Sequence, residues 1–119
     1  MNKELVMYAR TTPCAFVTLA RRVLDDYGVA YREVFIDQDT EARQRVLDWT
    51  GFLAVPTLIA AAEGDDVPST EPTYLAPGAS PRGIDRGPMI TEPNINQLLA
   101  WLERHGFTSP AEDTASQRV

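Results

Sequence analysis

A short apolar run gives way to a helical pattern at Tyr8-Ala9-Arg10-Thr11-Thr12-Pro13-Cys14-Ala15-Phe16-Val17. This stretch holds Cys14, the single cysteine of the chain. A thiol between a strand and the start of a helix lies beside unpaired backbone N–H groups and the positive end of the helix dipole. Such surroundings favour the thiolate, which is the reactive form of cysteine. The alternative is a small buried apolar side chain, because free cysteine is among the most buried residue types.

The residues around this stretch predict the order strand, helix, strand, helix, strand. Apolar runs predict strands over residues 5–8 and 29–37, and a third over 52–62 that Pro56 opens. A helix is predicted over about 41–50, capped by Asp39 or Thr40 and ended by Gly51. Gly28 is expected to end the first helix, whose inward-facing stripe has helical spacing: Phe16, Leu19, Ala20, Val23, Leu24 and Tyr27. The first three elements form a βαβ unit with a right-handed crossover.

Residues 63–91 break this regularity, because prolines and glycines recur there without a sustained period. A short strand is expected within them, either at residues 73–75 or at residues 88–90. A last helix is predicted over about 93–105, with its cap supplied by Asn94 and Gln97 or by Thr91. We expect its inward face to carry Ile95, Leu98, Leu99 and Leu102, and Trp101 to reach the surface in part.

Composition indicates one globular domain and excludes several classes of function. The chain has 119 residues, 44% of them hydrophobic and 24% charged. A net charge of -6 and the lack of a basic run argue against nucleic-acid binding. No apolar run is long enough to span a membrane, and no signal-peptide pattern opens the chain. With one cysteine there is no internal disulfide, so a cytoplasmic location is expected. One cysteine and one histidine, His105, predict no metal site within a single chain.

Several separate segments together resemble the thioredoxin fold and, within it, the glutaredoxin family. The matching segments are Val6-Met7-Tyr8, the tetrad Cys14-Ala15-Phe16-Val17, residues 31–37 with the following turn, and Val55-Pro56-Thr57. The resemblance implies an α/β domain over residues 1–107, with a central mixed sheet of about four strands flanked by three helices. Residues 63–91 would then form a long Pro/Gly-rich insertion before the last helix. Residues 108–119 are small, polar and charged, and are expected to be a disordered tail.

The same resemblance implies where the chemistry takes place. Cys14 would be the catalytic nucleophile, and a cis peptide bond at Pro56 would pack beside it. The backbone of Val55 would pair with an extended substrate, commonly the cysteinyl part of glutathione. Glutathione is therefore the implied co-substrate, and small-thiol or protein mixed disulfides are the implied partners. The implied substrate-binding residues are Arg10, Thr12, Ala15, Phe16, Val55 and Pro56.

Three departures from the family pattern leave alternatives open. Val17 stands where dithiol members have a second cysteine, so the chemistry would be monothiol. Ala15 and Val17 differ from the Cys-Gly-Phe-Ser tetrad of relatives that carry iron–sulfur clusters. The Gly-Gly and acidic residue that hold the γ-glutamyl end of glutathione are matched only loosely, by Gly83-Ile84-Asp85. The alternatives to a monothiol oxidoreductase are a redox-inactive binding or dimerisation module and, less favoured, an iron–sulfur carrier built from two chains.

Two arginines of the irregular segment, Arg82 and Arg86, could have a binding role or could simply lie at the solvated surface. Either could reach a substrate carboxylate or an acidic patch on a partner. We expect solvated surface positions for both.

Overall fold

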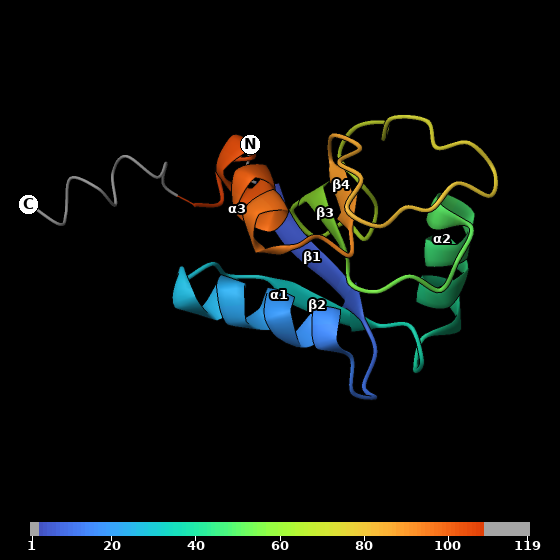
Figure 1. Cartoon of the computed structure of the whole chain (residues 1–119), viewed down its shortest axis with the longest axis horizontal. Coiled ribbons are helices and arrows are strands. Elements are labelled where there is room, and N and C mark those ends of the chain that lie inside the picture. Colours follow the sequence, from blue (N-terminus) through green and yellow to red (C-terminus); the bar gives the residue numbers. More distant parts are fainter. Residues whose placement is uncertain (1–2, 109–119) are drawn as a thin grey trace, which may run out of the picture.

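The computed structural model describes residues 3–108, and these form a four-stranded mixed sheet with three helices. The elements in chain order are β1 (Lys3–Ala9), α1 (Ala15–Asp26), β2 (Arg32–Phe35), α2 (Thr40–Thr50), β3 (Thr57–Ala62), β4 (Met89–Thr91) and α3 (Ile95–Arg104). The strand order is β2-β1-β3-β4, with β1 parallel to β2 and the other neighbours antiparallel. This is the predicted thioredoxin fold, and Figure 1 shows α1 and α3 on one side of the sheet and α2 on the other.

The strand β1 lies inside the sheet, between β2 and β3, and this position accounts for the continuous apolar run near the start of the chain. Both faces of the sheet are covered by helices, so side chains pointing either way from β1 are buried. Leu5 to Ala9 are each at most 1% exposed. Tyr8 is among them, and its ring meets the edge of the Trp49 ring at a centroid distance of 5.3 Å.

The helix boundaries follow from the capping residues that the sequence contains. The Asp39 carboxylate accepts hydrogen bonds from the backbone N–H groups of Glu41 and Ala42, so α2 begins at Thr40. Asn94 and Gln97 form a capping box, which places the start of α3 at Ile95 rather than Pro93. Gly51, with a φ of 80°, ends α2 as predicted.

Three burial predictions for the helices were wrong. Tyr27 is 52% exposed because it lies at the C-cap of α1, beyond the last inward-facing turn. Ile95 is 45% exposed because it is the first residue of α3 and precedes the part of the helix that covers the sheet. Trp101 is fully buried, since its indole N–H donates to the Gly87 carbonyl and its ring stacks on Phe107.

The irregular segment after β3 ends in a strand and is attached to the sheet in several places. Of the two candidate positions, residues 88–90 are close to the observed β4, whereas 73–75 form no strand. Single bridges pair Pro68 with β3, and Arg82 and Asp85 with β4. Arg86 is only 8% exposed, so the expected surface position was wrong for this arginine. Its side chain donates to the backbone carbonyls of Thr73 and Trp49.

The proposed tail lies almost wholly outside the described residues, which end at Thr108. Within residues 3–108, no helix is long and apolar enough to cross a bilayer. The same residues hold no group of three or more His, Cys, Asp or Glu side chains that could bind a metal ion.

Candidate functional site

Cys14 is the N-cap residue of α1, as the strand-to-helix pattern predicted. Its backbone is extended, with a φ of -154° and a ψ of 123°, and its carbonyl accepts the Thr18 N–H at 3.0 Å. The side chain makes no capping hydrogen bond and is partly exposed. Cys14 is therefore at the edge of the core, partly buried against it, at the start of the helix.

The second part of the site is the Val55–Pro56 peptide just before β3, and its peptide bond is cis. The Cys14 sulfur lies 3.9 Å from the Val55 carbonyl oxygen. The Pro56 carbonyl accepts the backbone N–H of Glu92 at 2.8 Å, which connects this peptide to the end of β4. The expected cis bond and its position beside the cysteine are both present.

The loop between β1 and Cys14 is held by Asp37, a residue that the sequence analysis did not single out. The Asp37 carboxylate accepts the Thr11 N–H at 3.0 Å and the Thr11 hydroxyl at 2.6 Å, and the Thr12 backbone also donates to it. The Thr11 hydroxyl is the largest of the influences that lower the pKa of Asp37. The loop that precedes the thiol is thus fixed to the chain segment that follows β2.

Arg10 forms a hydrogen bond within the same loop. Its Nη2 donates to the Pro13 carbonyl at 3.0 Å, while its Nε is buried without a hydrogen-bond partner among the described residues. The Arg10–Pro13 hydrogen bond does not involve the Cys14 thiol. The predicted roles of Arg10 and Thr12 in binding substrate therefore stay predictions.

A cleft of about 320 Å³ adjoins the Val55–Pro56 peptide. It is lined by Phe52, Leu53, Ala54, Ser80, Pro81, Arg82 and Glu92. The guanidinium carbon of Arg82 lies 5.0 Å from the centre of the Phe16 ring, so the wall of the cleft reaches back to α1. Arg82 also pairs with Glu92 at 3.3 Å. The cleft thus begins one residue from the carbonyl that faces the sulfur.

Glu92 forms one wall of this cleft. Glu92 has a φ of 45°, in the left-handed region that glycine adopts most readily. Gly83 packs against the first turn of α3, and a Cβ there would lie 2.9 Å from the Gln97 side chain. Glu92 lies two residues before Asn94, the N-cap of α3.

The fourth residue of the tetrad, Val17, is 1% exposed and belongs to the hydrophobic core. Ala15 and Phe16 continue α1 directly from Cys14. The structure therefore brings Cys14, Phe16 and Val55 to one place, with Pro56 next to them.

Comparison with known proteins finds a family match in the first half of the chain. Residues 5–63 match the family model described as Glutaredoxin. A crystal structure of a buckwheat glutaredoxin–glutathione complex is 25% identical, with a TM-score of 0.40. That match spans 47% of this chain and 53% of the buckwheat chain. No curated protein matches the chain.

Proposed function

Because the chain is a glutaredoxin-like protein with the thioredoxin fold, we propose that it is a monothiol thiol-disulfide oxidoreductase acting through Cys14. Its substrates would be mixed disulfides of glutathione or a similar small thiol. The observation that carries the proposal is the position of the Cys14 sulfur. Cys14 is partly exposed at the start of α1, and its sulfur lies 3.9 Å from the carbonyl oxygen of Val55, the residue before Pro56.

The reaction would proceed by two thiol–disulfide exchanges. The Cys14 thiolate attacks the glutathione sulfur of the mixed disulfide, and the other sulfur leaves with the bonding electron pair as a thiolate that takes up a proton. A second glutathione thiolate then attacks the glutathione sulfur bound to Cys14. Glutathione disulfide is released and the Cys14 thiolate is restored. No second protein thiol is required, which fits an apolar Val17 in the core.

The cleft beside Val55 supplies groups that suit the charged ends of glutathione. The Glu92 carboxylate would accept the glutamyl ammonium group, and Arg82, whose side chain is 62% exposed, would hold a carboxylate. The backbone of Val55 and the side chains of Phe16 and Pro56 would position the cysteinyl part. Arg10, Thr12 and Ala15 would border the bound tripeptide on the α1 side.

The test is glutathione-dependent reduction of the mixed disulfide between glutathione and 2-mercaptoethanol. We expect Cys14→Ser to lose the activity entirely, because the chain has no other thiol. Mass spectrometry of the wild type treated with glutathione disulfide should show one glutathione attached at Cys14. Ser69→Ala, a change on a different part of the surface, serves as the control. Equal rates for Cys14→Ser and the wild type would refute the proposal.

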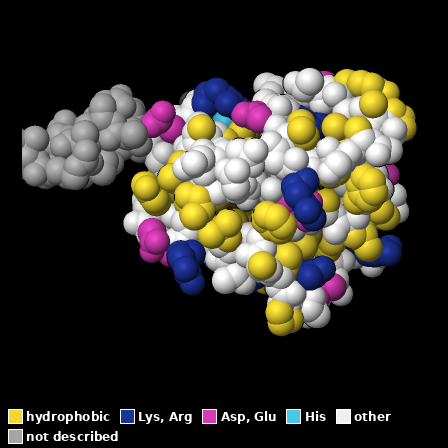
Figure 2. Space-filling model, in the orientation of Figure 1, with side chains coloured by type: hydrophobic (Ala, Val, Ile, Leu, Met, Phe, Trp, Pro, Cys, Tyr) yellow, Lys and Arg dark blue, Asp and Glu magenta, His cyan; other side chains and the backbone are white. Residues whose placement is uncertain are grey.

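A redox-inactive binding or dimerisation module is the second candidate. Phe52 and Leu53 beside the cleft are 45% and 43% exposed, so they offer an apolar surface to a partner or a second copy. Apolar side chains also gather on the face shown in Figure 2. A protein that forms a concentration-dependent dimer, yet neither accepts glutathione at Cys14 nor reduces the substrate, would favour this candidate.

An iron–sulfur carrier is the third candidate, with Cys14 from each of two chains and thiols from two glutathione molecules as the cluster ligands. This candidate predicts that the protein absorbs visible light after anaerobic reconstitution with iron and sulfide. The cytoplasmic location is likewise a proposal, and fluorescence microscopy of the tagged full chain tests it.

A further inference from the structure

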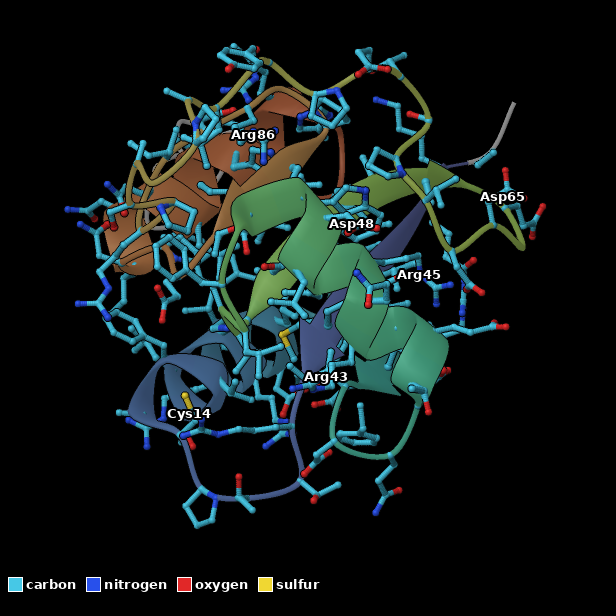
Figure 3. All side chains as sticks on the ribbon, turned by 90° about the vertical axis from the view of Figure 1, so that its right-hand side faces the viewer. Cys14, Arg43, Arg45, Asp48, Asp65 and Arg86 are labelled. Atoms are coloured by element: carbon cyan, nitrogen blue, oxygen red, sulfur yellow. The ribbon has the colours of Figure 1, made fainter. Side chains whose placement is uncertain are left out.

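A second cavity, of about 560 Å³, lies between α2 and the segment that follows β3. It is lined by Asp48, Trp49, Val67, Pro68, Ser69, Thr70, Glu71, Pro72 and Arg86. None of these residues belongs to the Cys14 site or lines its cleft. In Figure 3, Arg86 lies near the upper end of α2, whereas Cys14 lies below that helix.

Arg86 is an unusual group for a cavity wall, because it is a buried cation without a carboxylate partner. The residue is 8% exposed, and its Nε and Nη1 donate to the carbonyls of Thr73 and Trp49 at 2.7 and 2.6 Å. Among residues 3–108 no carboxylate forms an ion pair with it. Burial lowers the pKa of Arg86, and Glu71 opposes this from a longer distance. The guanidinium nevertheless stays charged at neutral pH, because arginine does not lose its proton in proteins.

An unpaired buried charge is costly, and an anion in the adjoining cavity would offset that cost. The carbonyl of Trp49 is near the C-terminal end of α2, so the helix dipole stabilises the cation in part. Neither carbonyl carries a full negative charge. The hydrogen bonds that fix Arg86 use Nε and Nη1, which leaves Nη2 for a ligand oxygen.

The other lining residues limit the kind of anion. Asp48 and Glu71 are exposed carboxylates on the same cavity, so they disfavour a phosphate or any ligand with several negative charges. They also attract a positive group. Trp49, Val67 and the two prolines provide apolar surface between the charges.

We propose that this cavity binds a small zwitterion, either a free amino acid or a short peptide with an apolar side chain. The ligand carboxylate pairs with Arg86, its ammonium group faces Asp48 and Glu71, and its side chain packs on Trp49. The volume is within the range of small-molecule sites. The inference does not depend on redox activity at Cys14.

The test compares three probes that share one apolar body: L-phenylalanine, 3-phenylpropionate without the ammonium group, and 2-phenylethylamine without the carboxylate. Each is titrated into the full ¹⁵N-labelled chain and followed by amide chemical shifts. We expect phenylalanine to bind at least about tenfold more tightly than either truncated probe. The shifts should cluster at residues 69–72 and at the Trp49 indole. Equal affinities, no saturable binding, or shifts confined to Ala54 and Arg82 would overturn the proposal.

Variants separate the two charged ends of the ligand. Glu71→Gln should weaken the binding of phenylalanine and leave the binding of 3-phenylpropionate unchanged or tighter. The reason is that only the zwitterion has an ammonium group that the Glu71 carboxylate attracts. Arg86→Lys keeps the charge but loses the planar fork, so both carboxylate probes should weaken by about tenfold. Arg82→Gln is the matched control, since this arginine lines the other cleft. Unchanged affinities in both Glu71→Gln and Arg86→Lys would also contradict the proposal, and the exposed Glu71 position makes that result independent of folding.

Discussion

The loop before Cys14 is hydrogen-bonded to another part of the chain through the Asp37 carboxylate. Asp37 follows β2 and accepts the backbone N–H groups of both Thr11 and Thr12, together with the Thr11 hydroxyl. Because these contacts join segments 26 residues apart, they hold the loop in place before the helix begins. Asp37 is thus a positioning residue for the thiol, although it does not touch the sulfur.

Asp37→Ala should loosen this loop without unfolding the domain, since the side chain is exposed. We expect amide hydrogen exchange at Thr11 and Thr12 to quicken several-fold, because their acceptor is lost. Asp39→Asn is the control: asparagine caps a helix as well as aspartate does, so it should leave the same amides unchanged. Unchanged exchange in Asp37→Ala would show that the loop is held by other contacts.

At the scale of elements, the segment after β3 depends on Arg86, which connects Thr73 to the end of α2. Arg86→Gln should destabilise the protein by about 2–3 kcal/mol, because it leaves two carbonyls without their charged donor. Arg82→Gln removes an arginine whose side chain is 62% exposed and should cost about 1 kcal/mol or less. Urea denaturation of both variants measures the difference. Similar losses for the two would mean that Arg86 does not anchor the segment.

The elements themselves could be predicted wherever a local signal specifies them. Caps such as Asp39 and Asn94 act within a few residues, so the helix boundaries were within two residues of those observed. The segment after β3 has no such period. Its course is set by contacts such as Arg86 to Trp49, which connect residues 37 apart, and a local pattern does not contain that information.

At the scale of the whole molecule, only part of the candidate site could be predicted from the sequence. Cys14 and Val55 could be paired because the order of strands and helices implies the fold, and the fold brings them together. Glu92 and Asp37 could not be assigned, since their roles depend on where loops of irregular length return to the sheet. Sequence alone therefore predicted that Cys14 and the Val55–Pro56 peptide lie together, but not which residues hold or enclose them.

The pH dependence of stability should report one contact between α3 and the segment before β4. The ring Nε2 of His105, at the C-cap of α3, lies 2.7 Å from the Gly87 carbonyl oxygen, and the ring packs on Trp101. Burial is the main cause of its lowered pKa; Lys3 and Arg104 act in the same direction, while the Gly87 contact and Asp85 oppose it. The folded state thus favours the neutral ring. Below the unfolded value of about 6.5 the unfolded chain binds more protons, so acidification favours unfolding.

We therefore expect the free energy of unfolding to fall between about pH 7.5 and about pH 5.5, and to fall less in His105→Gln. His105 is the single histidine, so the variant removes the one histidine titration in this window. The pKa values of Glu4, which bonds Arg32, and of Asp37 are also lowered in the folded state. The stability that these two carboxylates contribute is therefore lost only at more acidic pH, below about 4.5. Urea denaturation at both pH values measures the slope. An equal slope in the variant, or a wild type that gains stability on acidification, would contradict the assignment of this pH dependence to the His105 ring.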